Sequence, residues 1–245
     1  MLDVHAPHQS THTWADFFIH IGTIAVGLLL AIGLEQLVEH LHHRHQAVEL
    51  RENLQAESQQ ILGDTDHCIG SMQYRIDWLN TRIDQVKQAV WERKTLAAAS
   101  HFQPAGCAAP DNPIWRTAKA SGLAFYLSKG EVTGYSEIEY VVSHELDRVK
   151  PYHQASGEIN QFLAIFPSQP NGQPDISRAS PVDLRKYLAL LTEQRETLSR
   201  SLFSLHLVRG ATRAVSDGET HLNAIYKAER ADANADTILT PFRQY

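Results

Sequence analysis

An uncharged apolar stretch near the N-terminus constrains the fold more than any other part of the sequence. No Asp, Glu, Lys or Arg stands between Phe17 and Leu34, and extending the stretch to Val38 gives 22 residues. A helix rises about 1.5 Å per residue and needs about 20 apolar residues to cross a hydrocarbon layer about 30 Å thick. Trp14 precedes the stretch, as aromatic residues do at a membrane interface. The sequence therefore predicts a short tail, 1–16, and a transmembrane helix, 17–38.

Two other structures compete with this retained membrane anchor: a cleaved signal peptide and the buried core helix of a globular domain. A signal peptide begins with a basic segment, and here no Lys or Arg precedes Arg44. Ala31-Ile32-Gly33 nevertheless has the small-x-small form that a signal peptidase accepts. We favour the retained anchor, because its length and its aromatic residues fit a membrane span.

Small residues recur at every fourth position of the predicted span, at Thr23, Gly27 and Ala31. Small residues at this spacing let two membrane helices approach closely. Membrane helices are also rich in small residues when they do not pair. The pattern predicts that the chain self-associates through this face, as a homo-oligomer or within a larger membrane protein complex, and ordinary composition is the alternative.

Helical periodicity continues beyond the span. The segment 39–62 contains neither Pro nor Gly, which predicts a helical extension that ends near Gly63. Asp64 or Thr65 then caps a second helix. Its apolar residues follow alternating steps of three and four, a coiled-coil-like heptad pattern typical of a helix packed along another helix. These residues are Ile69, Met72, Ile76, Leu79, Ile83, Val86 and Val90. The pattern leaves open whether the partner helix belongs to the same chain.

The remainder, 63–245, is predicted to form an antiparallel helical bundle. Ile114–Leu127 has the pattern of a short helix, and Glu131–Phe166 that of a long helix that Pro151 kinks or breaks. Long helices joined by loops, without alternating strand runs, indicate an all-α fold. A short strand pair near Phe102 is the less favoured alternative for that segment.

Two further helices complete the predicted bundle. Ser180 precedes Pro181 and an acidic first turn, which indicates a capped helix start. That helix continues past Arg209, and Asp217-Gly218 interrupts it. A last helical segment covers 219–231.

Two blocks of sequence carry a family resemblance. The first comprises a His-Thr-Trp start, a Gly-rich apolar helix and a His-His-Arg-His run, at His12-Thr13-Trp14, Leu34-Glu35-Gln36 and His42-His43-Arg44-His45. The second comprises Trp115, Thr117-Ala118 and Gly122-Leu123. These blocks resemble an uncharacterised family of bacterial single-pass inner-membrane proteins, from which the second block departs at Leu123, where the family pattern has Ala. The resemblance implies a bacterial inner-membrane setting, and it supplies no activity that could be carried over to this chain.

Histidines gather at both edges of the predicted span. His5, His8, His12 and His20 precede or begin it, and His40, His42, His43 and His45 follow it. Glu39 and His42 have the Glu-x-x-His form of di-iron carboxylate bundles, but the sequence has no second copy. Imidazoles at this density bind Zn, Cu or Ni. Glu39, His42 and His43 are therefore weak metal candidates. We favour histidines that decorate the membrane interfaces, and no cofactor is predicted.

The two cysteines, Cys68 and Cys107, flank the heptad helix. If that helix ends near Val90, Cys68 lies about 33 Å from its end at about 1.5 Å per residue. The chain from Val90 to Cys107 extends at most about 56 Å. A disulfide that ties the returning loop to the start of the helix is therefore within reach in an oxidising compartment, and two separate thiols are the alternative.

Composition and motifs exclude several classes of function. The net charge of −6, from 22 Lys+Arg and 28 Asp+Glu, argues against a nucleic-acid partner, because nucleic-acid binding depends on cationic contacts with phosphate. His144-Glu145 begins a zinc-protease motif, but Arg148 stands where the second His belongs. Gly-x-Ser-x-Gly, phosphate-binding glycine loops and Cys-x-x-Cys pairs do not occur. We therefore predict that the chain is not an enzyme.

Orientation and function follow from these features as expectations. Arg44 and Arg51 after the span favour a cytoplasmic C-terminal domain, but long domains cross the membrane regardless of such charges. We favour a periplasmic domain on a single-pass inner-membrane anchor. The predicted function is a helical structural or interaction protein, self-associating or an accessory subunit of a membrane complex. The alternative is an extracytoplasmic ligand-binding or sensory module that acts through a partner, with a pocket near Trp115, Phe125 and Tyr140.

Overall fold

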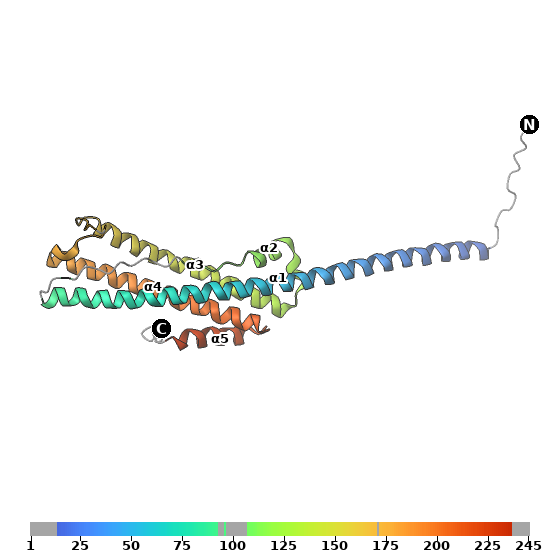
Figure 1. Cartoon of the computed structure of the whole chain (residues 1–245). Helices are drawn as coiled ribbons and strands as arrows, with labels where there is room; N and C mark the ends of the chain where they lie inside the picture. Colours follow the sequence, from blue (N-terminus) through green and yellow to red (C-terminus); the bar gives the residue numbers. More distant parts are fainter. Residues whose placement is uncertain (1–13, 93–95, 97–106, 171, 237–245) are drawn as a thin grey trace, which may run out of the picture. The chain divides into compact units, whose positions relative to one another are not determined.

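The computed structural model describes residues 14–92, 96, 107–170 and 172–236, and these are all-α, as predicted (Figure 1). Five α-helices and two 3-10 helices follow one another in the described residues: α1 Trp14–Glu92, α2 Pro113–Ser121, η1 Leu123–Tyr126, α3 Lys129–Leu163, η2 Ile176–Arg178, α4 Pro181–Ser216 and α5 Leu222–Ala235. One isolated β-bridge, between Ser168 and Pro174, is the only strand-like pairing in this part of the chain. Phe102, near which a strand pair was the less favoured alternative, lies outside the described residues.

α1 is a single helix of 79 residues, so the predicted helix end near Gly63 is wrong. A glycine in a helix interior costs about 1 kcal/mol relative to alanine. Buried side chains on both sides of it, including Ile61, Thr65 and Cys68, hold the helix together through that position. Asp64 and Thr65 are therefore interior residues of α1 and cap nothing.

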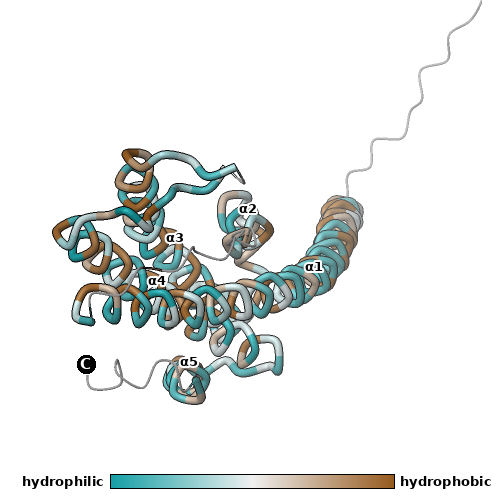
Figure 2. The backbone as a smooth tube through the Cα atoms, turned by 60° about the vertical axis from the view of Figure 1, so that its left-hand side comes forward, coloured by the Kyte–Doolittle hydropathy of each residue, from teal (hydrophilic) through white to brown (hydrophobic). Residues whose placement is uncertain are grey.

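The chain divides into two compact units, Met1–Glu49 and Leu50–Tyr245. In the first unit, large apolar side chains from Phe17 to Leu41 are exposed, and Figure 2 shows this part of α1 mostly in brown. Among the described residues, α1 is the one helix long and apolar enough to cross a membrane, and none of its most apolar window is buried.

The second unit is a bundle in which α4 returns antiparallel to α1 and α3, and α5 folds back along α4 (Figure 1). The heptad side chains from Ile69 to Val86 are buried, and Val90 packs against them. Their partners belong to the same chain: Ile159 and Phe162 of α3, and Leu184, Tyr187, Leu191, Leu198, Leu202 and Leu205 of α4. The heptad prediction is thus confirmed, and its face is occupied inside the bundle.

A second core cluster lies toward the start of the bundle. Trp115 of α2, Ile138 of α3, Val208 of α4 and Ile225 of α5 meet the α1 side chains Leu50, Leu54 and Ile61. Gly210 allows this close packing. A Cβ atom at that position would lie 2.6 Å from the Glu229 Cα, so only glycine permits α5 to approach α4 so closely.

Capping hydrogen bonds and the backbone conformation of glycine determine where α4 begins and ends. Ser180 Oγ accepts a hydrogen bond from the Asp183 N–H at 3.2 Å, while the Asp183 carboxylate accepts one from the Ser180 N–H at 3.1 Å, which confirms the predicted cap. α4 ends at Ser216, and Gly218 has a φ of 90°, in agreement with the predicted interruption.

Two details of the predicted bundle differ from the structure. The predicted helix 114–127 is divided at Gly122, whose φ of 81° is left-handed, into α2 and η1. Pro151 lies inside α3 and does not break it. The turns after Pro151 carry Ala155, Ile159 and Phe162 into the core, and this burial offsets the missing backbone hydrogen bond.

Candidate functional site

A cavity of about 670 Å³ lies within the second unit, between α1, α3 and α4. Two chain segments complete its wall: the stretch that contains Cys107, Ala109 and Pro110, and the turn before η2 that contains Gly172, Gln173 and Pro174. Its volume lies within the usual range of small-molecule sites, about 300–1,000 Å³. The bundle therefore contains a partly open cavity of the size that a ligand needs.

Apolar side chains from all three helices form most of this wall. They lie at positions spaced by three, four or seven residues on their helices, so each helix turns one stripe toward the cavity. These residues are Met72 of α1, Ile159 and Leu163 of α3, and Leu191, Leu198 and Leu205 of α4. The aromatic rings of Trp78, Tyr152 and Tyr187 complete it.

A chain of hydrogen bonds crosses the cavity wall from α1 to α3. Arg75 Nη2 donates to Gln194 Oε1 at 3.2 Å, and Gln194 Nε2 donates to Ser156 Oγ at 2.8 Å. The Arg75 guanidinium also lies 4.4 Å from the centre of the Trp78 ring, within cation–π distance. Burial lowers the pKa of Arg75, and Tyr152 and Tyr187 oppose that shift. A guanidinium remains charged under these conditions, so the wall holds a fixed positive charge.

Arg82 places a second guanidinium on the same wall, two helical turns further along α1. Its side chain is 2% exposed, its Nη1 donates to Gln85 Oε1 at 3.0 Å, and its guanidinium carbon lies 5.8 Å from the centre of the Tyr187 ring. A charged residue so deeply buried is rare in helical bundles. Two arginines on one cavity wall are therefore the feature of the site that most requires an explanation.

Glu145 of α3 is the one Asp or Glu among the described residues that line the cavity. Burial raises its pKa from 4.5 to about 8, although a hydrogen bond with Ser204 and the charge of Arg148 oppose the shift. The carboxyl is therefore largely protonated at neutral pH. Its Oε2 atom is buried and has no hydrogen-bond partner among the described residues. The wall consequently carries more positive than negative charge.

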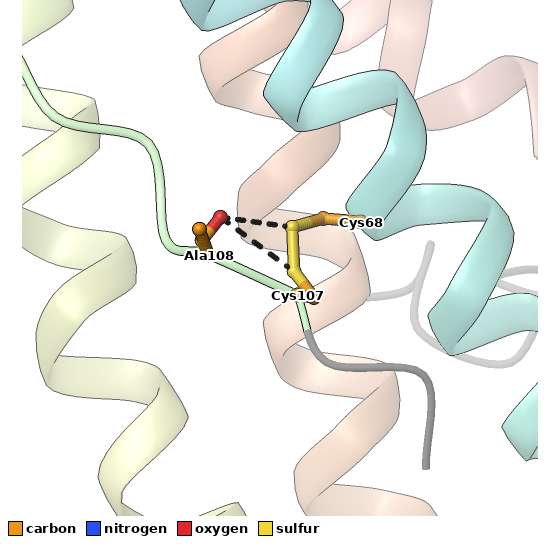
Figure 3. The surroundings of a disulfide bond; sticks show 3 residues. All are labelled: Cys68, Cys107 and Ala108. Carbon is orange, nitrogen blue, oxygen red and sulfur yellow. Dashed lines mark hydrogen bonds between the residues drawn. A yellow bond between two sulfur atoms is a disulfide. The ribbon is translucent and has the colours of Figure 1, made fainter. Parts of the chain in front are cut away.

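A disulfide between Cys68 and Cys107 forms part of the cavity wall (Figure 3). The two Cα atoms lie 5.2 Å apart, and the two sulfur atoms lie 3.2 and 3.8 Å from the carbonyl oxygen of Ala108. The structure thus confirms the predicted disulfide. It fixes the segment that precedes α2 against α1.

The pocket expected near Trp115, Phe125 and Tyr140 is not found there. Trp115 is 1% exposed in the second core cluster, and its Nε1 donates to Glu139 Oε2 at 3.1 Å. Phe125 and Tyr140 are exposed, at 91% and 55%. The prediction was wrong because α2 packs its tryptophan directly into the second core cluster, and the cavity described above does not include any of these three residues.

The polar cavity residues had a signal in the sequence that the apolar pattern concealed. Arg75 and Arg82 each precede a heptad isoleucine and are seven residues apart, so they share one edge of the buried face. Glu145 and Gln194 likewise stand among apolar residues of their helices. Polar positions beside a buried stripe also occur on every amphipathic helix, so this signal alone does not distinguish a cavity wall from a solvated helix edge.

The metal candidates lie in the first unit. His43 Nε2 lies 3.8 Å from Glu39 Oε1, and the ring centres of His42 and His43 are 6.5 Å apart. In the part of the chain that the structure describes, no group of three or more His, Cys, Asp or Glu side chains could hold a metal ion. His5, His8 and His12 lie outside that part.

The small-residue face of the predicted span is exposed in the described residues. Thr23 Oγ1 donates to the Ile19 carbonyl at 2.8 Å, and a Cβ atom at Gly27 would meet no other atom within 4 Å. Together with Ala31, these residues leave room for another helix. Self-association through this face stays a prediction.

A second buried polar cluster joins α5 to α4. His206 is 2% exposed, with Nδ1 at 2.7 Å from Asp232 Oδ1 and Nε2 at 2.8 Å from Asp236 Oδ2. Arg209 donates to both Asp232 oxygens and, through Nη1, to Asp66 of α1 at 2.9 Å. This cluster fixes α5 to the bundle and does not line the cavity.

Comparison with known proteins adds no assignment to this geometry, and the predicted family resemblance stays a prediction. The cavity and its charges are therefore the basis for a functional proposal. No protein-family model, no curated protein and no solved structure matches the chain.

Proposed function

We propose that the chain is a membrane-anchored helical module that binds a small molecule between α1, α3 and α4. One observation carries this proposal: a cavity of about 670 Å³ whose apolar wall contains a few buried polar side chains. Small-molecule sites combine these two properties, because apolar surface supplies affinity and a few polar groups fix the orientation of the ligand. The heptad face is occupied inside the bundle, which weakens the original expectation of an interaction protein that pairs through it.

The first unit and the disulfide support an extracytoplasmic site for this module. Exposed apolar side chains such as Ile24, Leu28 and Leu29 suit lipid contact. Disulfides persist in oxidising compartments such as the bacterial periplasm, and the chain joins its Cys68 and Cys107. We therefore assign the anchor to the bacterial inner membrane, the second unit to the periplasm, and signal output to a partner protein.

Binding is tested with the full chain in phosphatidylcholine nanodiscs and with 1-anilinonaphthalene-8-sulfonate, whose fluorescence rises in apolar sites. We expect saturable binding beyond that of empty nanodiscs. Val149 lines the cavity, whereas the next residue, Lys150, is exposed and does not. Val149→Trp should abolish the saturable signal, and Lys150→Trp should preserve it. Equal signals from both variants, or none from the unmodified chain, would contradict the proposal.

Orientation is tested separately by fusing alkaline phosphatase or green fluorescent protein after Tyr245. A periplasmic second unit gives an active phosphatase and a dark fluorescent protein, because the phosphatase requires disulfides and the fluorescent protein folds in the cytoplasm. The reverse pattern would place the second unit in the cytoplasm and leave the cavity proposal to its own test.

A second candidate function is an accessory subunit that associates through the span. The small residues Thr23, Gly27 and Ala31 on one face and the exposure of the apolar helix favour it. Gly27→Ile should abolish crosslinked oligomers in native membranes, whereas Gly22→Ile, on another face of the helix, should not. Monomer alone in the unmodified chain, with no co-purifying subunit, would reject this candidate.

A further inference from the structure

Positive charge dominates the polar part of the cavity wall. Arg75 and Arg82 line the cavity, and Glu145 is the one carboxyl residue among the described lining residues. Because burial keeps that carboxyl largely protonated at neutral pH, it does not neutralise the arginines. Gln194 and Gln85, which accept hydrogen bonds from the two guanidinium groups, are neutral amides. An oxyanion therefore complements this wall better than a neutral or cationic group does.

The two arginines border one continuous stretch of the wall. They are seven residues apart on α1, which separates their Cα atoms by about 10.5 Å along one helix face. The rings of Trp78 and Tyr187 lie beside them, 4.4 and 5.8 Å from the two guanidinium carbons. This stretch is the charged part of the cavity wall.

Most of the remaining wall is apolar, and the cavity is too large for a small inorganic anion. The apolar side chains come from three elements: Ile159 and Leu163 of α3, Leu191, Leu198 and Leu205 of α4, and Ile176 of η2. A water molecule occupies about 30 Å³ of liquid volume, so a free phosphate or sulfate would leave most of the 670 Å³ without contacts. The ligand must therefore carry an apolar body as well as a charge.

We infer that the cavity binds an amphipathic anion, with its oxyanion head along Arg75 and Arg82 and its apolar body against the leucine and isoleucine wall. This inference rests on the proposed function, because it names the ligand class for the same cavity. Carboxylate-headed and phosphate-headed amphiphiles share this chemistry, since a guanidinium binds either head through paired N–H donors. A bilayer is a source of both kinds of molecule.

Trp78 provides a reporter inside the cavity, because bromine quenches the fluorescence of a tryptophan that it contacts. Trp14→Phe and Trp91→Phe remove the two exposed tryptophans and leave Trp78 and the buried Trp115. The full chain with these two substitutions, in phosphatidylcholine nanodiscs, is titrated with 2-bromoundecanoate, 2-bromoundecyl phosphate, 2-bromoundecanol and 2-bromoundecyltrimethylammonium, which carry the bromine beside the head group. Adding Trp78→Phe to the variant gives the background of quenching outside the cavity.

We expect saturable quenching by the two anions, at least tenfold weaker binding of the alcohol and the cation, and loss of the signal with Trp78→Phe. Arg75→Met and Arg82→Met should each weaken anion binding at least tenfold, and Arg185→Met, on the exposed face of α4, should not. Stronger binding of the carboxylate than of the phosphate identifies a fatty-acid-like ligand, and the reverse order a phospholipid-like one.

Two contrary results have different meanings. If the alcohol or the cation binds as tightly as the anions, or if neither arginine variant weakens anion binding, the ligand class is wrong and the cavity is still a binding site. If no probe quenches Trp78 saturably while 1-anilinonaphthalene-8-sulfonate still binds, the ligand class is wrong, and if that dye does not bind either, the proposed function is rejected as well. The comparison of head groups uses intact arginines, so it tests the ligand class even if Arg82→Met fails to fold.

Discussion

Cys68 of α1 is bonded to Cys107 across 39 positions of sequence, with their Cα atoms 5.2 Å apart. The bond closes a loop of the chain that contains α1 from Cys68 to its end at Glu92. It therefore restrains the unfolded chain and holds one wall of the cavity in place.

Removal of this disulfide should destabilise the second unit. The loop-closure model gives about 4 kcal/mol for a loop of this length. Guanidinium chloride unfolding of the full chain in nanodiscs, followed by circular dichroism, should show a lower midpoint after reduction and for Cys68→Ser/Cys107→Ser. Reductant should leave the midpoint of the double variant unchanged. An equal midpoint with and without the bond would show that it makes no contribution to stability.

Glu145 should make the bundle less stable as the pH rises. Its pKa is about 8 in the folded chain and 4.5 ordinarily, so the folded state holds the proton more tightly. No stability is lost below about pH 4.5. Between there and about pH 8 the unfolded chain ionises first, and the free energy of unfolding falls by about 1.4 kcal/mol per pH unit. Above about pH 8 the loss levels off.

Glu145→Gln isolates this effect. We expect the free energy of unfolding of the variant, relative to the unmodified chain, to rise from pH 5 to pH 8 by a few kcal/mol. Glu229 contributes a similar decline in both chains, because burial and the nearby Glu137 raise its pKa to about 7. The difference between the two curves cancels that contribution. A constant difference between pH 5 and pH 8 would show that Glu145 ionises as freely in the folded chain as in the unfolded one.

Glu131 should give the opposite pH dependence. The hydrogen bond from Arg51 and those from Ser128 lower its pKa to about 2, although burial opposes the shift. Arg51 Nε donates to Glu131 Oε1 at 2.6 Å. The resulting stability is present above about pH 4.5 and is lost as the pH falls toward 2. Glu131→Gln should therefore destabilise the bundle at pH 6 and have little effect at pH 2, as measured by chemical unfolding at the two pH values.

Local sequence patterns predicted most of the fold, because they report interactions between near neighbours. The heptad from Ile69 to Val90 specified a buried face, and Ser180-Pro181 specified a helix start. Gly63 was misleading, and Pro151 does not break α3, because their intrinsic penalties, about 1 and 3 kcal/mol, are smaller than the free energy gained by burying the turns on either side. Tertiary packing, which no local pattern encodes, decided both positions.

The cavity could not be predicted from the sequence in the same way. Arg75 and Arg82 are charged residues beside an apolar stripe, where side chains usually contact water. Only the packing of α3 and α4 against this side of α1 places them on a cavity wall. Cys68 and Cys107 were within reach by length alone, and the route of the chain decided that they meet. The position of a void depends on how three helices diverge, which is a property of the whole bundle.

A matched pair of glycine substitutions tests the packing of α5 on α4. At Gly210 an added Cβ would lie 2.6 Å from Glu229 Cα and 2.8 Å from the Ala228 carbonyl oxygen, so Gly210→Ala must push α5 away. At Gly63 an added Cβ meets nothing within 4 Å in a helix interior, so Gly63→Ala should stabilise α1 by up to about 1 kcal/mol. We expect Gly210→Ala to lower the free energy of unfolding by about 1–3 kcal/mol, as overpacking does.

The same Gly→Ala change is expected to lower the free energy of unfolding at one position and to raise it at the other. Opposite signs therefore distinguish the effect of packing from that of intrinsic helix propensity. Thermal and chemical unfolding of both variants in nanodiscs provide the measurement. Hydrogen exchange locates the effect, because amides of 222–235 should exchange faster in Gly210→Ala and at an unchanged rate in Gly63→Ala. If Gly210→Ala were as stable as the unmodified chain, α5 would not be packed against α4 as closely as these distances require.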